Sequence, residues 1–257
     1  MVRGLDIFRE YFRYFTGNYV IIGGTACDII IDDAGFTPRG TRDIDIILVV
    51  EALSADFVRQ FWQFVKEGHY GRKEKSTDER KHYRFINPEN KKFPFQIELF
   101  SREPDLLDLD EGTPLTPIPV DDDLSSLSAI LMNKDYYTYT IEHCTVDGNI
   151  NFANTEALVC LKAKAFLDLT KRKAGGEKVD GRNIRKHKTD IFRLAVMLTE
   201  DDIFELPQSI QSDLQEFLDT IVTELPGQAM FKEMGLGSIA PGKVFQQILN
   251  SFQLNGK

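Results

Sequence analysis

The sequence predicts an α+β protein in which a strand-and-helix half is followed by a mainly helical half. In the first half, short apolar segments rich in β-branched residues alternate with amphipathic segments of helical periodicity. After residue 154, amphipathic helical patterns follow one another. Between the halves, residues 106–123 are acidic and contain several prolines, which is typical of a boundary or a long surface connection. We therefore predict two domains, at residues 1–123 and 124–257.

Composition is that of an ordinary globular protein. The 257 residues are 42% hydrophobic and 28% charged, and the chain is long enough to bury a substantial core. A net charge of -9 argues against a generally basic protein that coats nucleic acid, but it leaves room for one local basic patch.

Cysteine and hydropathy patterns indicate a cytoplasmic protein. Cys27, Cys144 and Cys160 are odd in number, far apart and without CxxC spacing, so neither a disulfide framework nor a zinc site is indicated. The N-terminus is rich in charged residues, unlike a signal peptide. No apolar run approaches the ~20 residues of a membrane helix, so we expect no membrane association.

The first elements form a strand, a pair of glycines and a helix. A helix is predicted over residues 5–15, and a short apolar strand over residues 18–22. Gly23 and Gly24 follow, and Thr25 is a plausible N-cap of the next helix. Glycines let a ligand approach the backbone, and the N–H groups of a helix start attract phosphate. A tight turn with a purely structural role is the alternative.

The next strand carries two carboxylates on one face. From Ile44 to Val50 every residue except Asp45 is apolar, most of them are β-branched, and Asp43 and Asp45 stand at the start of this segment. Side chains alternate along a strand, so both carboxylates point the same way, with Cα atoms ~6–7 Å apart. Two anions repel each other, and a divalent cation such as Mg²⁺ would relieve the repulsion. Alternatively, the strand start is solvated and Asp43 pairs with Arg39 or Arg42.

A helix and a hairpin follow this strand. Ser54 can cap the helix, whose aromatic residues have helical spacing and are predicted to be core rather than a base-stacking platform. Residues 82–86 and 93–100 are predicted to be paired strands around a turn. Glu98 interrupts the second strand, and taken singly it is better explained by a salt bridge or an edge position. Together with the Asp43 and Asp45 pair, it is a candidate third ligand.

The second half is predicted to hold a hairpin over residues 140–152 with an Asp147-Gly148 turn, followed by helices. Lys162 lies at the border of a buried stripe, where a lysine either snorkels or points into a cleft that contains an anion. Structural pairing with Lys186 or Arg193 is the default explanation for Asp190. A basic run comprises Lys171, Arg172, Lys173, Lys178, Arg182, Arg185, Lys186 and Lys188. It is either a solvated face or a surface for a triphosphate or an RNA backbone.

The order of these motifs along the chain is similar to that in a known enzyme superfamily. The glycine turn, the Arg39-x-Thr41-x-Asp43-Ile44-Asp45 pattern and a later strand acid resemble the nucleotidyltransferase superfamily with the DNA-polymerase-β-like fold. Residues 156–165 and 186–194 resemble helical motifs of AbiEii-type nucleotidyltransferases, the toxins of type IV toxin–antitoxin systems. The resemblance spans roughly residues 15–200. It implies a mixed β-sheet flanked by helices, with a helical part that completes the nucleotide site.

The resemblance also implies roles for individual residues. The Mg²⁺ ligands and catalytic carboxylates would be Asp43, Asp45 and Glu98. The nucleotide-binding residues would be Gly23, Gly24 and Thr25 at the phosphates, Lys162 at the triphosphate, and Asp190 as the late acidic residue. The chain departs from the family in its glycine turn, where many members have Gly-Ser, and in a longer stretch before Asp43.

The implied activity is transfer of a nucleoside monophosphate from an NTP, with two Mg²⁺ ions and release of pyrophosphate. The acceptor would be RNA, such as a tRNA end, or a protein hydroxyl, and the AbiEii likeness implies growth inhibition and a cognate antitoxin. Two alternatives stand beside it. One is a catalytically idle nucleotide- or partner-binding protein on the same fold. The other is a small-molecule nucleotidyltransferase of the aminoglycoside type.

Overall fold

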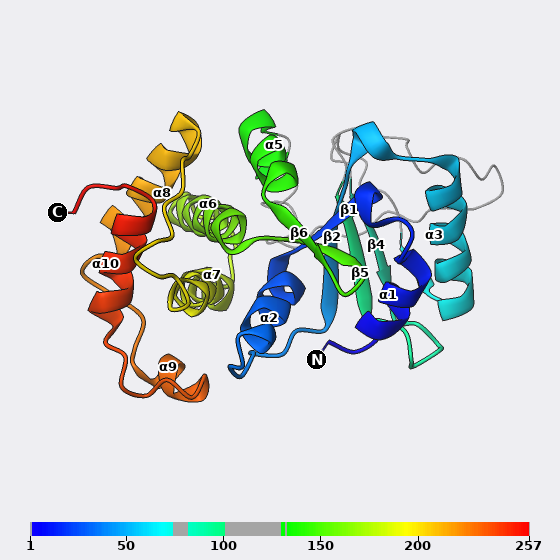
Figure 1. Cartoon of the computed structure of the whole chain (residues 1–257), viewed down its shortest axis with the longest axis horizontal. Coiled ribbons are helices and arrows are strands. Elements are labelled where there is room, and N and C mark those ends of the chain that lie inside the picture. The colour runs from blue at the N-terminus through cyan, green and yellow to red at the C-terminus, as the bar shows by residue number, and fades with distance from the viewer. Residues whose placement is uncertain (1, 74–81, 101–129, 132, 257) are drawn as a thin grey trace. The chain divides into compact units, whose positions relative to one another are not determined.

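The computed structural model describes residues 2–73, 82–100, 130–131 and 133–256 (Figure 1). The chain divides into two compact units, each built from separated segments. The sheet unit comprises Met1–Asp28, Gly40–Asp121 and Ile141–Ala153, and the helical unit comprises Ile29–Arg39, Asp122–Thr140 and Asn154–Lys257. The predicted boundary at residues 123 and 124 lies outside the described residues and stays a prediction.

The sheet unit contains a seven-stranded mixed sheet with the order β3-β4-β5-β2-β1-β7-β6. The β2–β5 and β1–β7 pairs are parallel, and the other neighbours are antiparallel. The predicted α+β class with a mixed sheet is confirmed. The strands are β1 Tyr19–Ile22, β2 Asp43–Leu48, β3 Gly71–Lys73, β4 His82–Ile86, β5 Gln96–Phe100, β6 Cys144–Asp147 and β7 Ile150–Ala153.

One face of the sheet packs against α1 (Leu5–Phe12) and α3 (Ala55–Gly68) through an aromatic core (Figure 1). Tyr19 on β1 meets Phe8, Phe12 and Phe57 edge-on or stacked, with ring centroids 5.3–6.4 Å apart. All four side chains are at most 2% exposed. The predicted core role of the α3 aromatics is confirmed, and the Ser54 hydroxyl caps α3 as expected by accepting from Phe57 N–H.

Helix α2 (Gly23–Asp33) starts directly after β1. The prediction of Thr25 as N-cap is therefore wrong, because Thr25 lies inside the first turn. Gly23 has φ +68°, a left-handed conformation that glycine adopts without strain, and this residue turns the chain from strand to helix. Short 3₁₀ turns at Thr16–Asn18 and Val50–Ala52 flank the β1–β2 pair.

The β6–β7 hairpin extends the sheet at its β1 side, where Ile21 pairs with Phe152. The hairpin belongs to the sheet unit, which includes Ile141–Ala153. Its turn has positive φ at Gly148 and Asn149, as a tight hairpin turn requires. The preceding α5 (Lys134–Glu142) occupies the start of the predicted first strand.

The helical unit packs apolar stripes of successive helices together. Leu158 and Leu169 on α6 (Thr155–Ala174) and Ile191 and Leu194 on α7 (Gly181–Ala195) are fully buried, as their helical spacing predicts. No described helix is long and apolar enough to cross a membrane. The helices after α5 are α6 Thr155–Ala174, α7 Gly181–Ala195, α8 Gln208–Ile221, α9 Ala229–Glu233 and α10 Pro241–Ser251.

Candidate active site

The three predicted metal-binding carboxylates lie on one face of the sheet. Asp43 and Asp45 alternate with buried Ile44 on β2, so they share the face opposite the aromatic core. In the parallel β2–β5 pair, Asp45 is directly opposite Glu98. Paired residues on neighbouring strands point to the same side and have Cα atoms ~4.8 Å apart. The sheet register therefore places Glu98 beside the aspartate pair.

The start of α2 lies against this carboxylate face. A Cβ on Gly23 would overlap the Asp45 carboxylate, and a Cβ on Gly24 would lie 2.9 Å from Thr41 Oγ1. Glycine is thus required at Gly23 by its positive φ and by the Asp45 side chain on β2, and at Gly24 by the close approach of Thr41 in the chain before β2. The first-turn N–H groups of a helix attract anions, so the start of α2, beside the Asp45 carboxylate, is a candidate site for a phosphate.

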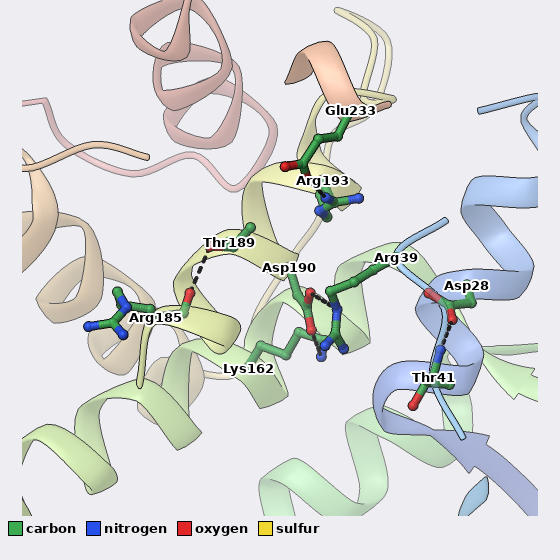
Figure 2. A network of polar contacts seen from close by, with 9 residues as sticks. All are labelled: Asp28, Arg39, Thr41, Lys162, Arg185, Thr189, Asp190, Arg193 and Glu233. Carbon is green, nitrogen blue, oxygen red and sulfur yellow. Dashed lines mark hydrogen bonds and ion pairs between the residues drawn. The ribbon is translucent and has the colours of Figure 1, made fainter. Parts of the chain in front are cut away.

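Two further residues of α2, Thr25 and Asp28, make hydrogen bonds to the segment that contains Thr41 and Asp43. Thr25 Oγ1 donates a hydrogen bond of 2.5 Å to Asp43 O. Thr41 N–H donates one of 2.6 Å to Asp28 Oδ2 (Figure 2). Because its hydroxyl hydrogen is directed at the strand, Thr25 would contact a phosphate through its backbone N–H. Sequence reasoning missed Asp28. The available signal was an aspartate with apolar residues on both sides of it in the sequence, Cys27 before it and Ile29 after it.

Glu98 is held by two neighbours on its own face of the sheet. Arg84 Nε on β4 and Gln96 Nε2 on β5 both donate to Glu98 Oε1, at 2.7 and 2.6 Å. The Glu98 and Arg84 side chains are 8% and 12% exposed. The salt bridge that we considered for Glu98 on its own is therefore present, whereas the edge position is wrong, because β5 lies between β4 and β2.

The donor set of this face suits Mg²⁺, which prefers carboxylate oxygens and often takes only one or two of them together with substrate phosphates. Asp43 and Asp45 supply that minimum. Within the described ranges, however, no group of three or more His, Cys, Asp or Glu side chains is arranged to hold a metal ion. The position of Glu98 on the sheet fits a third ligand, and its carboxylate is directed to Arg84.

Lys162 and Asp190, predicted separately as nucleotide-binding residues, pair with each other in the helical unit (Figure 2). Lys162 Nζ lies 2.8 Å from Asp190 Oδ2, and Arg39 Nε lies 3.4 Å from Asp190 Oδ1. Burial alone would raise the pKa of Asp190, but the positive charges of Lys162, Arg39 and Lys186 hold it below its usual value. The anion that Lys162 points to is thus a buried carboxylate of the protein.

Other ion pairs differ from the sequence interpretation. Arg39, an alternative partner of Asp43, is paired with Asp190, and Arg193 is paired with Glu233 at 2.9 Å. In the basic run, Arg172 pairs with Glu177 and Arg182 pairs with Asp180. The run thus combines locally neutralised arginines with exposed lysines such as Lys171 and Lys173.

Comparisons with known proteins give one weak structural likeness. No protein-family model matches the chain, and no curated protein matches it. One similar solved structure is the crystal structure of an antigenic nucleotidyltransferase-like protein from Paracoccidioides brasiliensis. It is 14% identical, with a TM-score of 0.43, over 88% of this chain and 94% of that chain. Functional assignment therefore rests on the residues of this chain and their geometry.

Proposed function

We propose that this chain is a metal-dependent nucleotidyltransferase that moves a nucleoside monophosphate from an NTP to an acceptor hydroxyl. One observation carries the proposal. Asp43, Asp45 and Glu98 share one face of two neighbouring parallel strands, and the helix that begins with Gly23 and Gly24 starts against that face. A carboxylate cluster beside a glycine-led helix start offers a metal site and a phosphate site together.

The residues of this face would position the reaction rather than react covalently. The carboxylates of Asp43, Asp45 and Glu98 would hold Mg²⁺, and the N–H groups of Gly24 and Thr25 would donate to phosphate oxygens. Bound Mg²⁺ would lower the pKa of the attacking hydroxyl and neutralise charge on the departing pyrophosphate. The acceptor hydroxyl would release its proton to water and its oxygen would bond to the α-phosphorus. The bond from that phosphorus to the oxygen that bridges to the β-phosphate would break, and pyrophosphate would leave with that oxygen.

In the helical unit, we assign Lys162 to the triphosphate and Asp190 to the positioning of Lys162. Three cations, Lys162, Arg39 and Lys186, act on the single carboxylate of Asp190. The assignment of Lys162 to the triphosphate follows the resemblance of residues 156–165 to the helical motif of the family. Asp190 holds the Lys162 ammonium in one place, so less of its side-chain entropy is lost when it binds phosphate.

A polyanionic acceptor is the best match to the charge of the helical unit. Residues 171–188 carry eight basic and two acidic residues, whereas the whole chain has a net charge of -9. We therefore favour RNA, such as a tRNA end, over a protein hydroxyl or an aminoglycoside as acceptor. An AbiEii-like toxin role with a cognate antitoxin is part of this proposal and rests on the sequence resemblance.

A second candidate function is a catalytically idle nucleotide-binding protein on the same fold. The observation that favours it is the buried ion pair between Arg84 and Glu98, which occupies the third carboxylate. An idle site has no physical need for three acids on one face, so transfer remains the stronger proposal. The two candidates differ in whether any acceptor becomes labelled.

The test is incubation of the protein with each α-labelled NTP and Mg²⁺, in separate reactions with total RNA, a protein mixture and an aminoglycoside. We expect label in RNA and its loss in Asp45→Asn. Asp56→Asn is the matched control, because Asp56 is an exposed acid on α3 in the same unit. Undiminished transfer by Asp45→Asn would refute the assignment, and nucleotide binding without transfer to any acceptor would support the idle protein.

A further inference from the structure

Arg84, Glu98 and Asp45 form a lateral row across three neighbouring strands. In the sheet register, Arg84 on β4 is directly opposite Glu98 on β5, and Glu98 is directly opposite Asp45 on β2. Directly paired residues point to the same side of a sheet. Glu98 therefore has a guanidinium on one side and a carboxylate on the other.

Hydrogen bonds draw the Glu98 carboxylate toward the Arg84 side of this row. Arg84 Nε and Gln96 Nε2 converge on the same oxygen, Oε1. Both members of the ion pair are nearly buried, so the charge-assisted contact is weakly screened by solvent. The backbone register brings the three carboxylate-bearing residues together. Because the Glu98 carboxylate points toward Arg84, the side chains of the described residues nevertheless form no group of three that could hold a metal ion.

We propose that Arg84 is a positioning residue that competes with the metal for the Glu98 carboxylate. The ion pair with Arg84 reduces the repulsion between Glu98 and the two aspartates. When a divalent cation binds at Asp43 and Asp45, Glu98 exchanges Arg84 for the cation, because a guanidinium held against a metal ligand repels the metal. The inference rests on the proposed function, since it concerns the same metal site.

The exchange gives the site a dependence on nucleotide. Arg84 weakens metal binding to the free protein, because the third carboxylate must first leave its partner. An incoming metal–nucleotide complex supplies phosphate oxygens, which are good partners for the released guanidinium. Metal and nucleotide would thus bind together more readily than metal alone.

Binding of Mn²⁺ to the nucleotide-free protein tests this directly, with free Mn²⁺ measured by electron paramagnetic resonance. Arg84→Gln should bind Mn²⁺ about ten-fold more tightly than the wild type, since a lost charge-assisted hydrogen bond to Glu98 is worth roughly that factor. Arg59→Gln is the matched control. It removes the same charge from the exposed surface of α3 and should leave Mn²⁺ affinity unchanged.

A double-mutant cycle separates exchange from a general charge effect. If Glu98 is what Arg84 withholds, the gain of Arg84→Gln should vanish when Glu98→Gln is also present. Arg84→Lys provides a second variant if Arg84→Gln fails to fold. Its point charge cannot reproduce the planar guanidinium, so it should give a smaller gain in the same direction.

Three results would overturn the proposal. Weaker Mn²⁺ binding in both Arg84 variants would mean that Arg84 orients Glu98 as a ligand. A gain that persists in the Glu98→Gln background would mean that Arg84 acts only through its charge. If Asp45→Asn does not reduce the Mn²⁺ binding of the wild type or of the Arg84 variants, Asp45 is not a metal ligand. Both this proposal and the proposed metal-dependent function are then refuted.

Discussion

Replacing Lys162 by methionine should destabilise the helical unit, because buried Asp190 would lose its nearest cation. Lys162 and Asp190 are 6% and 3% exposed, and their charged atoms are 2.8 Å apart. Removing one partner of such a buried pair costs ~3–5 kcal/mol of unfolding free energy. Arg39 remains 3.4 Å from the other Asp190 oxygen, so we expect a loss at the low end, ~3 kcal/mol.

The loss should depend on pH in a defined direction. The pKa of Asp190 is lowered in the folded protein, so its charge stabilises the fold above the unfolded-state pKa of ~3.9, and this stabilisation disappears as the pH falls through the folded pKa. Without Lys162, burial raises the Asp190 pKa with less opposition. The difference between variant and wild type should therefore be largest near about pH 7 and shrink toward about pH 4.

Urea unfolding followed by far-UV circular dichroism measures this loss in the helix-rich part of the chain. The single tryptophan, Trp62, lies on α3, so its fluorescence reports separately on the sheet unit. Lys164→Met is the matched control, because Lys164 pairs with Asp213 and is 34% exposed, where ion pairs contribute ~0–1 kcal/mol. A Lys162→Met loss below about 1 kcal/mol, or one that does not shrink in acid, would refute the reasoning.

Two further substitutions address the contacts at the start of α2. Gly23→Ala should cost the sheet unit ~1–2 kcal/mol from its φ of +68°, and it should also displace the Asp45 carboxylate and abolish label transfer. Gly148→Ala shares the positive φ, but its Cβ would meet Arg9 only at an ordinary contact distance of 3.8 Å, so this variant should lower the unfolding free energy and keep transfer. Thr25→Val should lose ~1 kcal/mol of unfolding free energy and reduce transfer, because Asp43 O loses the hydrogen bond from the Thr25 hydroxyl. Thr25→Ser should retain both the stability and the transfer. Equal behaviour of the two variants in urea unfolding and label transfer would contradict the role of this hydrogen bond.

The sequence predicted those features of the site that depend on local periodicity. Asp43 and Asp45 share a face because alternation along a strand follows from neighbouring residues alone. The aromatic side of α3 was recognisable for the same reason, from helical spacing. The position of Glu98 beside Asp45 was not predictable locally, because it depends on the pairing of strands that are about fifty residues apart.

Long-range partners account for the other differences. Arg84 gave no signal in the sequence, since its contact with Glu98 exists only once β4 and β5 pair. The Lys162–Asp190 pair joins residues 28 positions apart on two helices, whereas sequence reasoning looked three or four residues away. Thr25 was predicted as a cap because Gly23 and Gly24 were expected to form a turn before the helix, whereas the positive φ of Gly23 lets the helix begin at Gly23 itself.

The segmented construction of the sheet unit has a consequence for synthesis and truncation. Strand β1 lies between β2 and β7, yet β7 comes from residues 150–153, long after most of the sheet has left the ribosome. Until then, β1 presents an unpaired edge that can pair with another chain. A truncation that ends near residue 123 would make this exposure permanent. Fragments intended to isolate the sheet should therefore retain Ile141–Ala153.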